Sequence, residues 1–156
     1  MARVGFWAVE SAPIRFGRDG RWYAGDEAIV NPRIDALFSR HLRRTDDGSW
    51  WLVIADERAR IEIEDTPFVV RHVELEFDGG FALLLNDGTR EPLPAAGLGF
   101  GPDGALRCFV KDGLCEARFL RPAQIELLST ATTAGSAAFV PGPHGTRIPL
   151  HLPAAD

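Results

Sequence analysis

The chain has 156 residues, of which 46% are hydrophobic and 25% are charged, and its formal net charge is −5. This composition is typical of one globular domain or of two small subdomains, and it excludes disordered, fibrous and membrane-embedded proteins. The acidic excess argues against binding to nucleic acid, which requires clustered cationic side chains.

The N-terminal ten residues contain one short apolar run and no signal-peptidase site, and no stretch of the chain has the apolar length of a membrane span. We therefore expect a cytoplasmic protein that does not contact membranes. The two cysteines, Cys108 and Cys115, flank a predicted turn at residues 112–113, in a register that places Cys108 opposite Ala117. They then lie diagonally on one sheet face, too far apart for good disulfide geometry, and we expect free thiols.

The first predicted elements are a hairpin and a helix. Residues 14–24 form two strand-like runs around Asp19-Gly20, which is a strong hairpin signal. Asn31 and Pro32 then predict the start of a helix over residues 32–43. Its apolar face follows the spacing of Ile34, Leu37, Phe38, His41 and Leu42, and its outer face carries arginines.

A strand-rich stretch follows, with strands predicted over residues 49–54, 59–64 and 68–77. Ile61 and Ile63 alternate with charged residues in the second of these strands, and Val73, Leu75 and Phe77 do so in the third. Such alternation predicts a sheet with one buried face and one solvated face. Further strands are expected at 81–85, 106–110 and 114–120, with an irregular segment at 92–104.

A short helix is expected after Pro122, buried through Ile125 and Leu128. The order strand, turn, strand, proline, helix therefore occurs in residues 15–42 and again in residues 107–128. We interpret this as an internal repeat. The predicted fold class is α+β, with two small β-rich subdomains built from repeated strand-turn-strand-helix motifs.

The tail from residue 132 is poor in charge but contains the apolar pieces Phe139-Val140 and Ile148-Leu150. Two arrangements are open: the tail covers a sheet edge of its own subunit, or it packs on a partner subunit. We favour a homo-oligomer, most simply a two-fold dimer.

Several acidic residues are the first candidate site. Glu62, Glu64, Glu74 and Glu76, with His72, are expected on one face of adjacent strands. Grouped carboxylates bind hard cations or raise one another's pKa for acid-base catalysis. The favoured interpretation is nevertheless a solvated face, with Arg58 and Arg60 as cross-strand partners.

Two further positions are candidates for ligand contact. Asp65, in the turn before Pro67, either caps that turn or faces a ligand. Trp50 and Trp51 point to opposite faces of a strand, so we expect one ring in the core and the other exposed at a groove or a subunit interface, with Trp51 as the candidate for ligand contact.

No residue pattern supports catalysis. Residues 99–104, GFGPDG, match the glycine pattern of dinucleotide-binding loops, but a turn and a strand follow instead of a helix. The cysteines and histidines lack the spacing of a zinc site, and no catalytic triad can be assembled. We therefore expect no catalytic residues, no metal and no cofactor.

Three segments together resemble the bacterial family of unknown function DUF1285: DGRWYAGDEAIVNPRIDALFSRHLRR, RARIEIEDTPFV and KDGLCEARFLRPAQIELL. The resemblance covers about residues 14–130 and fades in the tail. It implies a mainly-β roll, which we place in residues 1–66, and an α/β roll in residues 67–131, followed by the tail over 132–156. It also implies a part in signal transduction, and it supplies no catalytic residues.

Three functions follow as expectations. The first is a non-enzymatic regulatory or ligand-binding protein that takes a small molecule in a cleft between its subdomains. The second is a metal-assisted hydrolytic enzyme that uses the acidic face. The third is a structural oligomerisation module.

Overall fold

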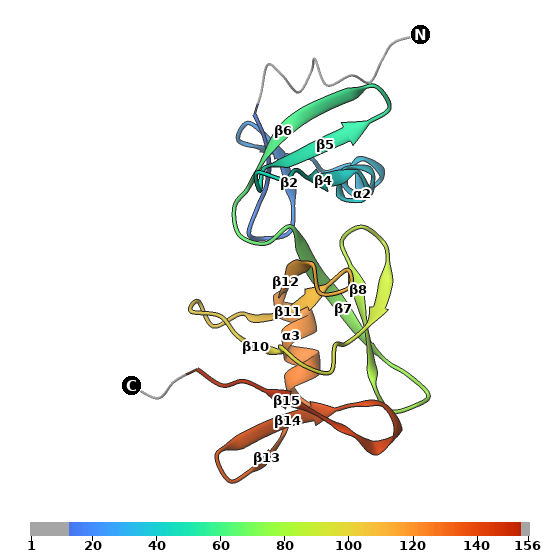
Figure 1. The fold of residues 1–156 in the computed structure, drawn as a ribbon, viewed down its shortest axis with the longest axis vertical. Coiled ribbons are helices and arrows are strands. Elements are labelled where there is room, and N and C mark those ends of the chain that lie inside the picture. Colours follow the sequence, from blue (N-terminus) through green and yellow to red (C-terminus); the bar gives the residue numbers. More distant parts are fainter. Residues whose placement is uncertain (1–12, 154–156) are drawn as a thin grey trace. The chain divides into compact units, whose positions relative to one another are not determined.

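A computed structural model describes residues 13–153 of the chain. The chain divides into two compact units, which we call unit 1 (Met1–Pro67) and unit 2 (Phe68–Asp156). Strands dominate both units, as Figure 1 shows. Within residues 13–153 each unit has one α-helix, so the predicted α+β class is right in outline for a mostly β structure.

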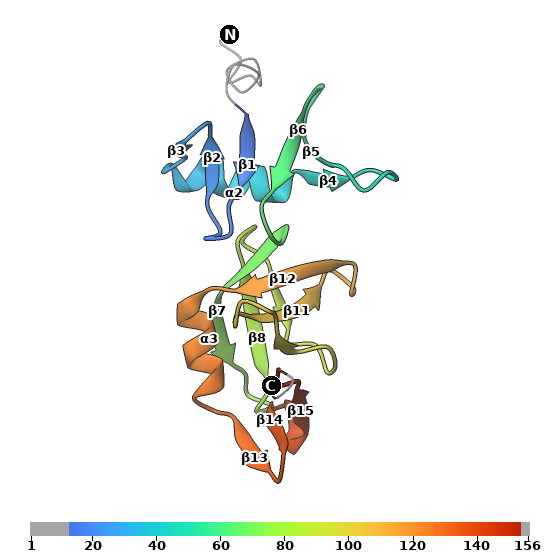
Figure 2. The same ribbon diagram turned by 90° about the vertical axis from the view of Figure 1, so that its left-hand side faces the viewer.

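Six strands of unit 1 form one sheet in the order β3-β2-β1-β6-β5-β4 (Figure 2). Their bounds are β1 (Ile14–Phe16), β2 (Trp22–Ala24), β3 (Glu27–Ala28), β4 (Leu42–Arg44), β5 (Trp50–Ile54) and β6 (Glu57–Ile63). All neighbours are antiparallel except the central pair β1–β6, which is parallel and aligns Arg15 with Glu62.

Unit 2 contains a second six-stranded sheet in the order β10-β11-β12-β7-β8-β9. Its strands are β7 (Phe68–Leu75), β8 (Phe81–Leu85), β9 (Arg90–Pro92), β10 (Gly99–Phe100), β11 (Leu106–Val110) and β12 (Cys115–Phe119). Here too the central pair, β7–β12, is parallel, and the other pairs are antiparallel.

The two sheets therefore have the same topology. In each, the first and the last of six strands pair in parallel at the centre, so that β1–β6 correspond in order to β7–β12. The sequence predicted a repeat, but it aligned the hairpin of residues 15–24 with that of residues 107–120. This alignment is wrong, because β1 and β2 are the first two strands of their sheet whereas β11 and β12 are the last two.

Trp22 is the centre of the core of unit 1 and is fully buried. Its ring lies 4.9 Å from that of Phe16 and 5.6 Å from that of Phe38, between centroids. The indole Nε1 donates a hydrogen bond of 2.9 Å to the hydroxyl of Ser39. Both Phe38 and Ser39 belong to helix α2 (Pro32–Arg40), so this cluster attaches the helix to the sheet.

Helix α2 begins as predicted, because the Asn31 side chain accepts a hydrogen bond from the backbone N–H of Arg33. It ends at Arg40, three residues earlier than expected. Leu42 has helical spacing in the sequence, but it pairs with Leu52 in the sheet and is buried there. Sheet pairing therefore replaces the last helical turn.

Helix α3 (Arg121–Leu128) packs against the sheet of unit 2, beside β7 (Figure 2). Ala123 and Leu127 are its buried residues, whereas Ile125 is 59% exposed. The prediction that Ile125 anchors this helix is thus wrong. The positions i and i+4 that face the core are 123 and 127, and residue 125 lies on the opposite side.

The tail forms a separate three-stranded sheet of β13 (Thr132–Ala134), β14 (Ala137–Pro141) and β15 (Arg147–Leu150). A short 3-10 turn, η1 (Pro143–Gly145), connects β14 to β15. Val140, Ile148 and Leu150 are buried in the same apolar cluster as Leu83, Leu106 and Phe119. This tail sheet is therefore part of the core of unit 2.

The end of the tail also covers an edge of the main sheet of unit 2. The backbone of His151 accepts a hydrogen bond from Phe100 N and donates one to the carbonyl of Leu98, at 3.2 and 2.9 Å. A Cβ at position 99 would lie 2.9 Å from the Cβ of His151, so glycine is required for this approach. The tail thus occupies the free side of β10.

Strand β7 departs from the predicted alternation. Val73 is buried, but Leu75 and Phe77 are 68% and 112% exposed, although we expected all three on the buried face. A β-bulge between Val70 and His72 shifts the register against β8, and β7 ends at Leu75, before the turn that contains Phe77.

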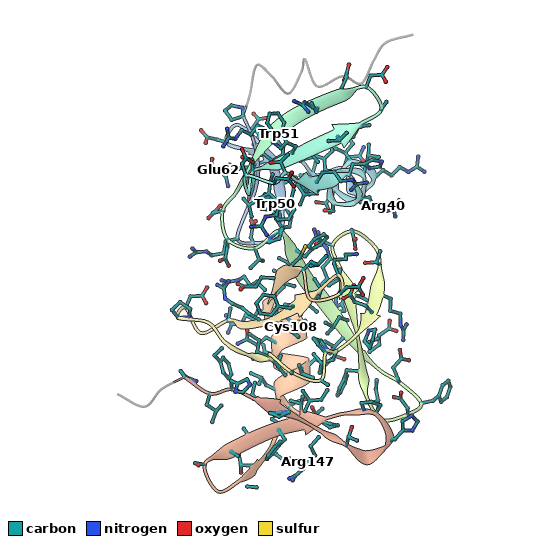
Figure 3. All side chains as sticks on the ribbon, viewed as in Figure 1. Arg40, Trp50, Trp51, Glu62, Cys108 and Arg147 are labelled. Carbon is teal, nitrogen blue, oxygen red and sulfur yellow. The ribbon has the colours of Figure 1, made fainter. Side chains whose placement is uncertain are left out.

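The cysteines have the predicted register, because Cys108 pairs with Ala117 and Val110 with Cys115, and neither of them forms a disulfide. Cys108 (Figure 3) is buried, and burial raises the pKa of its thiol to about 12. Cys115 is only partly buried. Because the thiolate is the reactive form, the two cysteines differ in reactivity.

We expect one thiol per folded chain to react rapidly with a disulfide reagent at pH 8, and the second to react only in denaturant. Cys115→Ser abolishes the rapid phase, whereas Cys108→Ala retains it. The measurement is the stoichiometry and rate of thiolate release. Rapid labelling of Cys108 in the Cys115→Ser protein would contradict its burial.

Candidate functional site

A pocket of about 330 Å³ lies in unit 2, where the turn between β7 and β8 meets the tail. The turn and the tail are far apart in the sequence. The lining is mainly apolar and consists of Phe77, Phe81, Pro92, Leu93, Pro143 and Ile148. Two acidic residues, Glu76 and Asp78, and Gly80 complete it.

Local hydrogen bonds fix the turn that forms one wall. The carboxylate of Asp78 accepts a bond of 2.9 Å from the backbone N–H of Gly80, and Glu76 N donates to the carbonyl of Gly80 at 2.8 Å. This is the capping role that Asp takes in tight turns. The turn leaves Phe77 with its side chain wholly exposed beside the pocket.

The opposite wall comes from η1. The backbone N–H of His144 donates a hydrogen bond of 2.6 Å to the carbonyl of Asp78, and His144 has a φ of +56°. A Cβ at position 80 would lie 3.0 Å from Pro143 N, so the close approach of turn and tail requires Gly80. The two walls are therefore joined directly by backbone contacts.

Carboxylates outnumber cations at the pocket rim. The guanidinium of Arg90 contacts Glu76 at 2.8 Å and also contacts Glu74. The hydrogen bond that Arg90 donates to Glu76 is the main reason why the pKa of Arg90 is raised, with Glu74 adding to it. Of these three residues only Glu76 lines the pocket, together with Asp78, so the described lining contains two carboxylates and no cationic side chain.

The acidic face predicted from sequence does not exist as expected. Glu62 and Glu64 lie on or just after β6, whereas His72 and Glu74 lie on β7. We expected adjacent strands of one sheet, but β6 belongs to the sheet of unit 1 and β7 to that of unit 2. The physical reason is the parallel pairing at each sheet centre, where β6 binds β1 and β7 binds β12.

The individual carboxylates are exposed and paired with arginines. Glu64 forms an ion pair of 3.0 Å with Arg15, and Glu74 pairs with Arg90. This agrees with the interpretation as solvated faces, although the partners are not Arg58 and Arg60. The predicted alternation of β6 is right, with Ile61 buried and Glu62 exposed.

Trp50 and Trp51 are both partly buried, so the expectation that one ring enters the core is wrong (Figure 3). Each is covered by an arginine: the Arg58 guanidinium lies 5.0 Å from the Trp51 ring, and that of Arg44 lies 5.7 Å from Trp50. Asp65 is partly buried in the link before Pro67. Neither Trp51 nor Asp65 lines the pocket of unit 2.

Sequence reasoning missed a charged cluster around Lys111, the only lysine of the chain. Its ammonium contacts the carboxylate of Asp87 at 2.6 Å and the hydroxyl of Thr89 at 2.8 Å. The side chain of Asp87 is almost fully buried. Burial favours a higher pKa for Asp87, but the bonds from Lys111 and Thr89 together outweigh it and lower the pKa.

A second missed cluster surrounds Asp103 in the GFGPDG turn. Burial favours a higher pKa for this carboxyl, but hydrogen bonds from Ala105 N and the Arg118 guanidinium outweigh it and hold the pKa below its usual range. Arg107 also binds Asp103, at 3.3 Å. The motif is thus a braced turn between strands, as predicted, and not a phosphate-binding loop.

The described part of the chain contains neither a cluster of metal ligands nor a helix that could span a membrane. In residues 13–153, no three His, Cys, Asp or Glu side chains gather closely enough to ligate a metal ion. Neither α2 nor α3 has the length and hydrophobicity that a membrane-spanning segment requires.

Comparison with known proteins identifies relatives of unknown function. Residues 7–66 match the N-terminal domain of a domain of unknown function, DUF1285. The chain resembles the crystal structure of a DUF1285 family protein from Silicibacter pomeroyi DSS-3, with 22% identity and a TM-score of 0.70, over 96% of this chain and 90% of that one. A DUF1285 family protein from Shewanella baltica OS155 matches with 14% identity and a TM-score of 0.42, over 90% and 85%. None of the curated proteins matches the chain.

The lowered pKa of Asp87 leads to a prediction about acid stability. A carboxyl whose pKa is lowered by folding stabilises the protein above its unfolded pKa, and this contribution is lost as the pH falls through the folded value. Lys111→Met should therefore reduce the free energy of unfolding at pH 7 by about 1–3 kcal/mol, because a buried charge loses its partner.

Urea unfolding between pH 7 and pH 3 checks this prediction. The deficit of Lys111→Met relative to the unmodified protein should shrink as the pH falls, because Asp87 becomes protonated in both. Glu64→Gln, which breaks an exposed pair, is the control and should cost less than about 1 kcal/mol. A deficit that stays constant with pH would show that Lys111 acts by packing alone.

Proposed function

We propose that this chain, whose residues 7–66 match the N-terminal domain of DUF1285, is a non-enzymatic protein that binds a small molecule and acts in regulation. The pocket of unit 2 supports the proposal most directly. Its volume of about 330 Å³ is at the lower end of the range of small-molecule sites, and apolar walls with a few polar groups at one side are typical of such sites.

The rigidity of the pocket walls also favours binding. The turn at Asp78 and the loop at Pro143 are held together by backbone contacts, so the pocket exists before a ligand arrives. Preformed sites bind with a smaller loss of conformational entropy. A ligand that contacts both walls would also hold the tail to the sheet, which is a simple way for binding to alter stability.

The alternative of a metal-assisted hydrolase loses its structural basis, because Glu62 and Glu64 do not share a sheet with His72 and Glu74. A thiol nucleophile at Cys108 is also disfavoured, because burial raises its pKa to about 12 and keeps it protonated. A role in binding therefore requires fewer assumptions than a role in catalysis.

We also retain two finer proposals. Unit 1 would be the mainly-β roll and unit 2 the α/β roll. The shared topology of their six-stranded sheets supports a division into two related subdomains. We also propose a reducing compartment such as the cytoplasm, which the reduced state of Cys108 and Cys115 supports.

A homodimer is the proposed assembly, with β13 as the contact. This edge strand consists of Thr132, Thr133 and Ala134, all exposed and uncharged, and lacks the charges and prolines that usually protect a sheet edge. We expect a dimer mass in light scattering at tens of micromolar, reduced to a monomer mass by Thr133→Lys but not by Thr146→Lys. A monomer mass for the unmodified protein would refute the dimer.

The ligand proposal predicts stabilisation in a thermal-shift screen of metabolites, nucleotides and phosphates. A ligand at a hundred times its Kd adds about 2.7 kcal/mol, which raises Tm by several degrees in a chain of this length. Pro92→Trp, which places an indole over the pocket from an exposed edge position, should abolish the shift.

The matched control is Pro92→Ala, which leaves the pocket open and should preserve the shift. If no compound stabilises the unmodified protein, or if Pro92→Trp and Pro92→Ala respond alike, the pocket is not the binding site.

A further inference from the structure

We propose that the pocket of unit 2 selects a cation, namely a small molecule that carries an amine on an apolar body. This inference rests on the proposed binding function and specifies the class of ligand. It follows from the charges at the rim, from the apolar lining, and from the position of Phe77.

The rim has a net negative charge in the described structure. Glu76 and Asp78 line the pocket, and Glu74 is connected to Glu76 through Arg90, which pairs with both glutamates. Arg90 is already bound to both glutamates, and no basic side chain of residues 13–153 pairs with Asp78. Three carboxylates and one guanidinium leave a net charge of −2 on these side chains, which are largely exposed beside the pocket.

The lining supplies the apolar part of the recognition. Phe81, Leu93 and Ile148 are largely buried and present only part of their surface to the pocket. A hydrocarbon or aromatic group placed against them loses contact with water, which is favourable in proportion to the apolar area covered. The pocket therefore fits a ligand with an apolar body on one side and a charge on the other.

Phe77 stands beside the carboxylates with its whole side chain exposed. An aromatic face attracts a cation within about 6 Å of its centroid, and the attraction is stronger when water is excluded. Arg90 is held by Glu74 and Glu76, so the ring of Phe77 is available to a cation that comes from the ligand. Its neighbours Glu76 and Asp78 would neutralise the same group.

Other ligand classes fit less well. An anion such as a phosphate or a carboxylate would be repelled by Glu76 and Asp78, because the described lining contains no cationic side chain. A neutral apolar molecule could use the apolar lining but would gain nothing from the net negative charge beside it. The cation is thus the class that uses both parts of the site.

Three probes that share a phenylethyl group and differ in the polar end group test the proposal: 2-phenylethylamine, 2-phenylethanol and 3-phenylpropanoate. Each is titrated into the full chain and followed by amide chemical shifts in NMR spectra. We expect the amine to bind about threefold to tenfold more tightly than the alcohol, and the carboxylate to bind most weakly. Raising the salt from 10 to 300 mM should narrow the difference between amine and alcohol.

Variants identify the groups responsible. Glu76→Gln should weaken the amine about threefold to tenfold and leave the alcohol unchanged. Glu116→Gln is the matched control, because this glutamate of unit 2 also pairs with an arginine, Arg107, but does not line the pocket. Phe77→Leu keeps an apolar side chain while removing the aromatic face, so it should also weaken the amine selectively.

The outcomes separate this inference from the proposed function. If the alcohol binds as tightly as the amine, or if the carboxylate binds best, the charge selection is refuted while the pocket remains a binding site. If none of the three probes shifts the pocket signals, the inference is refuted as well. The metabolite screen with Pro92→Trp then decides separately whether the pocket binds any ligand at all.

Discussion

The parallel pairing of the first and last strands at the centre of each sheet determines how the rest of this protein is arranged. Arg15 aligns with Glu62 in unit 1, and Phe68 aligns with Ala117 in unit 2. Each pair joins residues almost fifty positions apart, so the intervening strands are placed outward from the centre in two antiparallel groups. The central strands are then flanked on both sides, and the short outer strands occupy the edges.

This strand pairing explains why the predicted acidic face does not form and why the pocket of unit 2 does. Because β6 ends unit 1 at a sheet centre and β7 begins unit 2 at another, the carboxylates that precede and follow the link belong to different sheets. The antiparallel group β7-β8-β9 in turn brings Glu76, Phe81 and Pro92 to one end of the sheet. The tail closes that end, and the pocket lies at the junction.

Local chemistry made much of the fold predictable from sequence. The Asp19-Gly20 hairpin, the Asn31 cap and the register of Cys108 against Ala117 depend on neighbours a few residues away, and all three predictions are confirmed. The end of α2, the bulge in β7 and the exposure of Ile125 depend on tertiary contacts that no local pattern encodes. The pocket was missed for the same reason, since Glu76 and Pro143 meet only in three dimensions. The ion pair between Lys111 and Asp87 could not be predicted either. The sequence shows only that the chain has a single lysine, and this does not indicate its partner.

The tail connects the family relationship to the proposed ligand. By sequence, the resemblance to the family ends near residue 130, but the similarity to the Silicibacter pomeroyi protein covers 96% of this chain, so the shared fold extends well into the tail. At 22% identity, that likeness establishes the fold and leaves the surface chemistry open. The tail contributes Pro143 and Ile148 to the wall of the pocket. The charge of the pocket comes from Glu76 and Asp78, which lie outside the tail. A fold of this kind can therefore keep its pocket while changing the ligand through a few rim residues, because the wall contacts are made by backbone and glycine, and the charges lie on exposed side chains that the core does not constrain.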